Sequence, residues 1–297
     1  MKTAYRIYRP QHPKASVFII HGMEEHKERY VPFAQYLCDH EIGVLIYDLP
    51  GHGDIPKEDM GWFGETDGYR RLILSAVDAA TETKKAFPNV PLFCLGHSMG
   101  SMIARNFLQK YSDLIDGMIL SGAPCYQPGA PAGKVLVKII AMQKGKKGHS
   151  KLLDDMSTGS FNRSVENPRT EADWLSYDTD NVDAYLADEK CGVPFTVQGY
   201  GDLFELVIRM HDVSAYKVSK PDLPIVILTG EDDPCTGGIK GVSDSLNTLV
   251  RAGYMNVEAH AYPHMRHEIL NETEKMTVWQ DITDWIDAHI CTCEKRR

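Results

Sequence analysis

Residues 95–101 read LGHSMGS and place Ser98 between two glycines. The stretch follows an apolar run that ends at Cys94 and precedes residues 102–111, which have the composition of a helix. A G-x-S-x-G pattern where a strand turns into a helix is typical of a nucleophile elbow, because the sharp turn exposes the serine hydroxyl and the glycines allow close approach. The alternative is a glycine-rich turn without chemistry, since the pattern alone also arises by chance. More distant residues must decide between the two.

The chain around this stretch alternates short apolar runs with longer amphipathic segments. This alternation is typical of βα units and predicts a mostly parallel sheet flanked by helices. We expect strands at residues 16–20, 44–47, 92–95, 118–120, 224–228 and 257–261, with a further edge strand at 4–8. Apolar residues recur at helical spacing over residues 69–80 and 278–290, and Gly253 marks the end of a helix over 243–252.

One long segment departs from this alternation. Residues 125–221 contain short helical patches and many Gly, Pro, Lys and Asp residues. A loop of that length without structure is improbable inside a compact domain, so we expect a helical insertion that lies over the sheet. The predicted organisation is a core domain built from residues 1–124 and 222–297, interrupted by a cap at 125–221.

A serine nucleophile requires a histidine base and a carboxylate that orients it. In the chain, the acid follows the nucleophile elbow and the histidine follows the acid, and each of them comes directly after a later strand. The sequence TGEDDP at 229–234 follows one predicted strand, and YPHMRHE at 262–268 follows the next. We therefore predict a triad of Ser98, Asp233 and His267. The neighbouring candidates are interpreted as turn or loop residues: Glu231, Asp232 and His264.

The reaction also requires donors for the negative charge that develops on the substrate oxygen. Two backbone amides usually supply them. One should be the amide of Met99, directly after the nucleophile. The other should follow an early strand, where FIIHGM at 18–23 allows close approach at Gly22 and makes the Met23 amide our candidate. A plain strand-ending turn is the alternative interpretation of His21 and Gly22.

Five motifs, taken in their order along the chain, resemble those of a known family. HGMEEHKERY, YDLPGHG, GHSMG, TGEDDP and YPHMRHE resemble the successive motifs of α/β-hydrolases of the monoacylglycerol lipase and lysophospholipase family, over about residues 16–124 and 222–290. Residues 166–192 are similar to the cap of bacterial members. The resemblance implies an α/β-hydrolase fold with a mostly parallel central sheet and a helical cap, and it maps the triad onto the same three residues. Cys235 departs from the family, whose members more often carry valine there.

Composition limits the classes of function. The net charge of −9 argues against non-specific nucleic-acid binding, and no 18-residue apolar run predicts a transmembrane helix. Residues 1–14 lack an apolar signal core, and the seven cysteines include no CxxC pair, which together predict a reducing, cytoplasmic location. Neither a metal-ligand spacing such as HExxH nor a phosphate-binding or dinucleotide fingerprint is present, so we expect no cofactor and no metal.

These observations predict a serine hydrolase of carboxylic esters that acts through an acyl-enzyme. The resemblance implies a monoacylglycerol or a lysophospholipid as the substrate. Two alternatives remain, a serine aminopeptidase or amidase of the same fold and a non-catalytic binding module.

The predicted cap also carries an apolar run at residues 134–142 that is interrupted and followed by lysines. This run is typical either of a surface for transient contact with an anionic membrane or micelle, or of an amphipathic helix whose lysines extend to water.

Overall fold

The computed structural model describes residues 4–294. Seven strands form one sheet in the order β1-β3-β2-β4-β5-β6-β7, in which β1 is antiparallel to β3 and all other pairs are parallel. The strands are β1 (Tyr5–Tyr8), β2 (Ala15–Ile20), β3 (Ile42–Tyr47), β4 (Leu92–His97), β5 (Gly117–Ser121), β6 (Ile225–Gly230) and β7 (Val257–Tyr262). Every strand that the sequence predicts coincides with one of them to within two residues, and the α/β fold class is confirmed.

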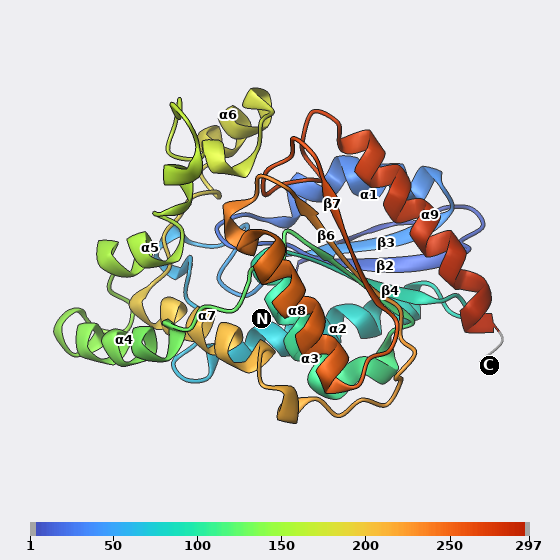
Figure 1. Ribbon diagram of the computed structural model, residues 1–297, viewed down its shortest axis with the longest axis horizontal. Coiled ribbons are helices and arrows are strands. Elements are labelled where there is room, and N and C mark those ends of the chain that lie inside the picture. Colours follow the sequence, from blue (N-terminus) through green and yellow to red (C-terminus); the bar gives the residue numbers. More distant parts are fainter. Residues whose placement is uncertain (1–3, 295–297) are drawn as a thin grey trace.

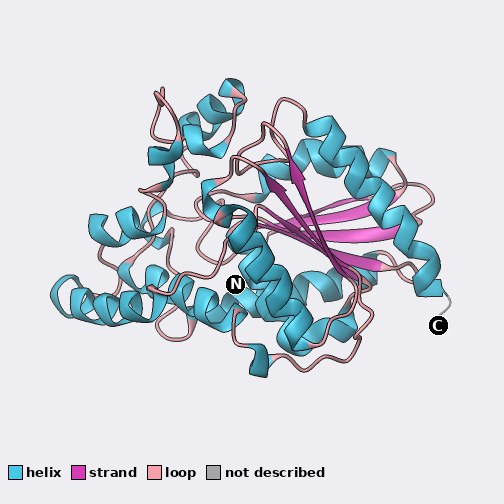
Figure 2. Ribbon diagram, in the orientation of Figure 1, coloured by secondary structure: helices cyan, strands magenta, loops and turns pink. Residues whose placement is uncertain are grey.

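The sheet is buried because helices cover both of its faces. Helices α1 (Val31–Asp39) and α9 (Lys275–Glu294) cover one face, while α2 (Gly68–Ala86), α3 (Met99–Tyr111) and α8 (Gly238–Ala252) cover the other (Figures 1 and 2). Strands β2 to β6 are accordingly buried throughout, as their nearly continuous apolar sequences require. Within each strand, successive side chains enter opposite core layers.

Four helices follow β5 and precede β6. They lie together on one side of the molecule, beyond the carboxyl ends of the strands (Figure 1). Their bounds are α4 (Ala130–Lys144), α5 (Lys151–Ser157), α6 (Thr179–Ala187) and α7 (Val197–Met210). Helix α7 shares the apolar core beneath the sheet, and Asn106 of α3 donates a hydrogen bond to the Leu206 carbonyl oxygen at 3.0 Å. The segment is therefore anchored to the core through α7.

Short 3-10 helices complete the described chain: η1 (Lys27–Tyr30), η2 (Lys57–Asp59), η3 (Ser112–Leu114), η4 (Phe161–Ser164), η5 (Asp173–Leu175), η6 (Val213–Ala215) and η7 (Pro234–Thr236). Within residues 4–294, none of the helices combines the length and the apolar character needed to cross a bilayer.

Candidate active site

Ser98 lies at a sharp turn between β4 and α3. Its φ of 52° and ψ of −121° fall outside the regions that residues other than glycine usually adopt. A Cβ atom on Gly100 would lie 2.1 Å from the Ile20 carbonyl oxygen, and one on Gly96 would lie 2.5 Å from the Gly100 carbonyl oxygen. Only glycine fits at both positions. The strand and the helix can therefore approach closely while the Ser98 side chain stays partly exposed.

Side chains from the ends of three strands meet at this turn. His267 Nε2 lies 2.8 Å from Ser98 Oγ, and His267 Nδ1 lies 2.9 Å from a carboxylate oxygen of Asp233. Asp233 is buried, and its other oxygen accepts a hydrogen bond from the Cys235 backbone N–H at 2.8 Å. The structure thus brings together the three residues that the sequence selects, with the connectivity that a Ser-His-Asp triad requires.

The surroundings of His267 suit a base. Burial lowers the pKa of the imidazole, but nearby carboxylates, Asp233 foremost, outweigh burial and raise the pKa above its ordinary value of 6.5. An Nδ1–H that donates to Asp233 leaves Nε2 free to accept the Ser98 proton. The indole of Trp174 lies 4.9 Å from the imidazole between ring centroids, so the segment between β5 and β6 reaches the histidine.

The alternative acids, Glu231 and Asp232, and the alternative histidine, His264, lie outside this triad. Asp232 is exposed and accepts a hydrogen bond from the Tyr177 hydroxyl at 3.0 Å. Glu231 and His264 are exposed in the turns that follow β6 and β7. Asp233 differs from Asp232 because it is the N-cap residue of η7, and its carboxylate accepts a hydrogen bond from the backbone of that short helix.

The two amides that the sequence proposes as oxyanion donors both belong to backbone beside Ser98. Met99 is the first residue of α3, so its N–H has no acceptor within the helix. Met23 follows Gly22 in the loop after β2. A Cβ atom on Gly22 would lie 3.1 Å from Ser98 Cβ, which shows how closely this loop passes the serine.

Two buried side chains hold this loop in place. The carboxylate of Glu25 accepts hydrogen bonds from the Gly22 backbone N–H and, at 2.7 Å, from the Tyr30 hydroxyl. His21 accepts a hydrogen bond from the Leu49 backbone N–H at 2.9 Å. Burial lowers the pKa of His21 to about 4, so the ring is neutral and can accept this bond. The backbone on either side of Met23 is therefore fixed to neighbouring elements.

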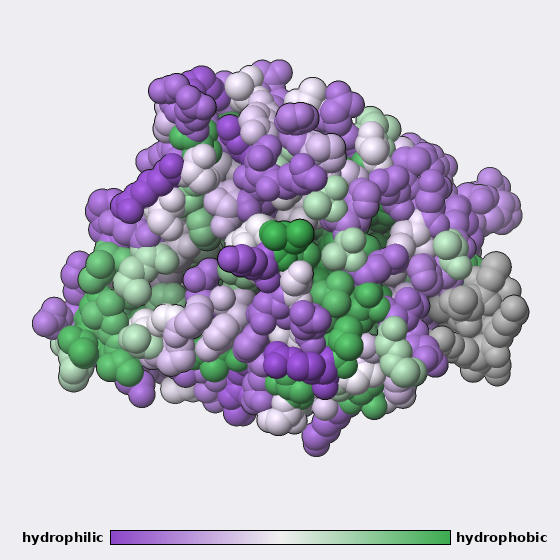
Figure 3. Space-filling model, viewed as in Figure 1, coloured by the Kyte–Doolittle hydropathy of each residue, from purple (hydrophilic) through white to green (hydrophobic). Residues whose placement is uncertain are grey.

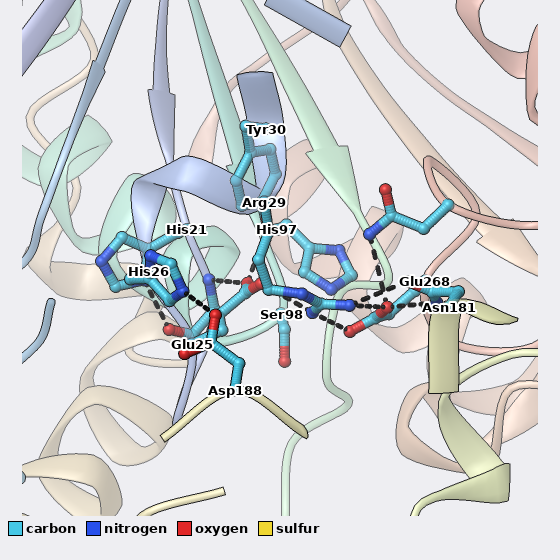
Figure 4. Close-up of polar contacts among 12 residues, drawn as sticks. His21, Glu25, His26, Arg29, Tyr30, His97, Ser98, Asn181, Asp188 and Glu268 are labelled. Atoms are coloured by element: carbon cyan, nitrogen blue, oxygen red, sulfur yellow. Dashed lines mark hydrogen bonds and ion pairs between the residues drawn. The ribbon is translucent and has the colours of Figure 1, made fainter. Parts of the chain in front are cut away.

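Arg29 links this loop to Glu268, the residue that follows His267 (Figure 4). Its guanidinium donates to Glu25 at 3.0 Å and to both carboxylate oxygens of Glu268, at 2.5 and 2.7 Å. Burial tends to raise the pKa of Glu268, but Arg29 lowers it to about 2, so the carboxylate stays charged. The three buried side chains form one cluster between the Gly22 loop and His267.

The segment between β5 and β6 joins this cluster (Figure 4). Asn181 of α6 donates to Glu268 at 2.7 Å and accepts from Arg29 at 2.9 Å. His26 and Asp188 form a second contact at 2.8 Å. The helices above the sheet are therefore held to the loop after β2 by polar contacts.

No motif in the sequence predicted this cluster. Glu25 and Arg29 lie four residues apart in HGMEEHKERY, a spacing that places two side chains on one helical face and that could have indicated their pairing. The contact of Arg29 with Glu268 joins positions 239 residues apart, for which one sequence carries no signal.

Within residues 4–294, two groups of side chains offer three metal-ligand atoms within 4.8 Å of one another. One group is His26, Asp188 and Cys191, whose nitrogen, oxygen and sulfur donors are of the types that zinc accepts. The other is Asp233, Cys235 and His267. In the second group, His267 Nδ1 and an Asp233 carboxylate oxygen already pair with each other at 2.9 Å.

The fold and this site define an α/β-hydrolase. A family model described as serine aminopeptidase S33, Hydrolase_4, matches residues 11–274. The chain belongs to this family.

Individual relatives agree with the family match. The chain is 27% identical over 300 residues to a monoacylglycerol lipase of Mycolicibacterium smegmatis, with 98% of this chain and 94% of the relative covered. It is 30% identical over 279 residues to a monoglyceride lipase of Mus musculus, with 94% and 84% covered. A solved structure of a thermostable carboxyl esterase from Bacillus coagulans in complex with glycerol has a TM-score of 0.89 and 26% identity, covering 97% of this chain and 94% of that one. These relatives support a carboxylic ester hydrolase similar to monoacylglycerol lipases, as the sequence predicts.

Proposed function

We propose that the protein hydrolyses carboxylic esters through a triad of Ser98, His267 and Asp233 and an acyl-enzyme intermediate. The observation that carries this proposal is the continuous chain of hydrogen bonds from the Ser98 hydroxyl through the His267 ring to the Asp233 carboxylate, at 2.8 and 2.9 Å. Such a chain lets the imidazole take the hydroxyl proton while the aspartate stabilises the imidazolium that forms.

The reaction has two halves. As Ser98 Oγ attacks the ester carbonyl carbon, its proton moves to His267 Nε2, and the carbonyl oxygen becomes an oxyanion bound by the Met23 and Met99 amides. When the tetrahedral intermediate collapses, the C–O bond to the alcohol breaks, and His267 gives its proton to the departing oxygen. Water then attacks the acyl-enzyme, with His267 as the base, which releases the acid and restores Ser98.

Monoacylglycerols and lysophospholipids are the substrates that we propose. The support is the resemblance to relatives that are named monoacylglycerol and monoglyceride lipases, with the Mycolicibacterium and Mus proteins among them. The family description also names an aminopeptidase, so amides are the competing substrate class. Comparing p-nitrophenyl esters with aminoacyl p-nitroanilides separates the two. Turnover of amides above that of esters would overturn our choice.

We propose that residues 125–221 form the cap and contact the lipid surface that supplies the substrate. Exposed apolar side chains gather on α4 and α5, at one edge of the molecule where Figure 3 shows hydrophobic atoms over α4. They are Val135, Ile139, Met142, Leu152 and Met156. Lysines flank them on α4, and a cationic rim favours contact with an anionic interface.

The free thiols of the five cysteines from Cys38 to Cys235 are compatible with the cytoplasmic location that we propose.

Labelling with a fluorophosphonate tests the proposed nucleophile. The native protein should label and lose esterase activity in parallel, and Ser98→Ala should do neither. Ser101 of α3 provides the matched control, because its buried hydroxyl donates to the Ser98 carbonyl oxygen and does not contact His267. Labelling of Ser98→Ala at the native rate would exclude Ser98 as the nucleophile.

A further inference from the structure

Glu24 occupies an unfavourable position beside the proposed oxyanion amide. It directly follows Met23 and has a φ of 56°, in the left-handed region that favours glycine. Its backbone oxygen accepts a hydrogen bond from the Gly192 N–H at 2.9 Å, which fixes the backbone here to the segment between β5 and β6. A glutamate side chain is thus held in a conformation that glycine would adopt with less strain.

The carboxyl group of Glu24 is enclosed yet incompletely bonded. Within the described residues, its Oε1 atom is buried and has no hydrogen-bond partner. The residue as a whole remains partly exposed, as do its neighbour Met23 and the proposed nucleophile Ser98. Leaving a buried polar atom unpaired destabilises a folded protein. The side chain and the backbone of Glu24 therefore both oppose folding.

The groups around Glu24 come from three helices. Asp154 of α5 raises its pKa, and the Asp154 carboxylate itself accepts a hydrogen bond from the Tyr200 hydroxyl of α7 at 2.7 Å. Tyr185 of α6 and Tyr200 both interact electrostatically with Glu24, and the Arg29 guanidinium lies 5.0 Å from the centre of the Tyr185 ring. Burial, followed by the charge of Asp154, raises the pKa of Glu24 to about 8. Glu24 is therefore mostly a neutral carboxylic acid at neutral pH.

A neutral carboxyl group with an unpaired oxygen suits the alcohol part of an ester substrate better than the acyl part. A long acyl chain placed against this carboxyl group would leave it unsatisfied, which is unfavourable. A hydroxyl group can donate to a carboxyl oxygen and can also accept from a protonated carboxyl. Strained residues and unpaired polar groups often occur at functional sites.

We propose that Glu24 binds a hydroxyl group of the alcohol part of the substrate and so makes the enzyme selective for monoesters of polyols. The proposal rests on the proposed ester hydrolysis and adds the residue that selects the alcohol. The test uses 1-monooctanoylglycerol and methyl octanoate, which share one acyl chain and differ in the alcohol. The measured quantity is the ratio of kcat/KM for the two esters.

Two variants and one control define the expected results. Glu24→Gly removes the side chain and relieves the backbone strain, and it should lower the ratio about 10-fold. Glu24→Gln keeps a neutral hydrogen-bonding group and should keep the ratio within about threefold of the native value. Asp155→Asn, an exposed acid beside Asp154, should leave the ratio unchanged. The native ratio should change above pH 8, as Glu24 ionises and can then only accept hydrogen bonds, whereas the ratio for Glu24→Gln should stay constant.

Two outcomes would overturn the proposal. The first is a ratio that is equal in the native protein and in Glu24→Gly. The second is loss of the ratio in Glu24→Gln as complete as in Glu24→Gly, together with native preference for octanoylcholine, which would make Glu24 a carboxylate that binds a cation. Fluorophosphonate labelling of Ser98 at equal rates in all variants shows that the triad is intact. If the native protein neither labels nor hydrolyses either ester, the proposed function itself fails.

Discussion

Arg29 and Glu268 form a two-pronged ion pair, largely shielded from solvent, between the loop after β2 and the residue next to His267. The exposed fractions of the two side chains are 10% and 4%, and Arg29 also contacts Glu25 and Asn181. Breaking such a pair from one side leaves a buried charge without compensation, which is far less favourable than removing both partners. The structure therefore makes Arg29 a residue on which both stability and the position of the active-site loop depend.

Arg29→Met should lower the free energy of unfolding by about 3–5 kcal/mol, because the carboxylates of Glu25 and Glu268 lose their common counter-ion. Urea denaturation followed by tryptophan fluorescence measures the change. Arg169→Met is the matched control, since its ion pair with Asp183 is exposed and should matter little. Equal midpoints for the two variants would contradict the assigned role of Arg29.

Asp233→Asn should lower kcat about 10⁴-fold, because an amide cannot hold the His267 ring in the reactive tautomer or stabilise the imidazolium. Asp232→Asn changes only the group that accepts from the Tyr177 hydroxyl and should change kcat little. Steady-state hydrolysis of a p-nitrophenyl ester measures both variants. The opposite ranking would transfer the role of the acid to Asp232.

The esterase activity should rise with pH as His267 loses its proton. Since the carboxylates around it outweigh burial and raise its pKa, the midpoint of kcat/KM should lie above 6.5. The profile is measured from pH 5 to 9 with a substrate that does not titrate. A midpoint below 6.5 would show that burial outweighs the carboxylates.

Glu24→Gln should stabilise the protein increasingly as the pH rises. The pKa of Glu24 is raised from 4.5 to about 8 in the folded state, so with respect to this group the native protein is most stable below pH 4.5 and loses stability as the pH rises from there through 8. Glutamine does not titrate. The difference in Tm between the variant and the native protein should therefore grow from pH 5 to pH 8, as measured by calorimetry. A difference that is independent of pH would place Glu24 in water.

Ile139→Asp should weaken binding to anionic vesicles and slow the hydrolysis of emulsified monoacylglycerol, because Ile139 belongs to the exposed apolar patch on α4 and α5. Hydrolysis of water-soluble p-nitrophenyl acetate should not change. Met255→Asp, at an exposed methionine outside this patch, should behave as the native protein. Vesicle binding that is unaffected by Ile139→Asp would remove the support for docking through α4.

The sheet could be predicted because each buried strand is a short apolar run between polar turns. The expected strand at 92–95 was two residues short, since Gly96 and His97 continue β4 up to the elbow although neither is typical of a strand. Asp233 and His267 were accessible to prediction because the carboxyl ends of parallel strands meet at one edge of a sheet. The role that we propose for Glu24 could not be predicted, because its environment comes from three helices of the inserted segment, whose packing no local pattern reveals.

The contact of Gly100 with the carbonyl oxygens of Ile20 and His21 has a wider consequence. It joins the start of α3 directly to β2, the strand from which the loop with Met23 departs. Main-chain packing thus sets how closely Ser98 approaches the end of β2, while the side chains of Glu25 and His21 hold the loop itself, and the side chains of Met23 and Met99 are not required for either. Mutations that alter which substrates fit, at Glu24 or on the helices above, can therefore accumulate without displacing the atoms that carry out the reaction.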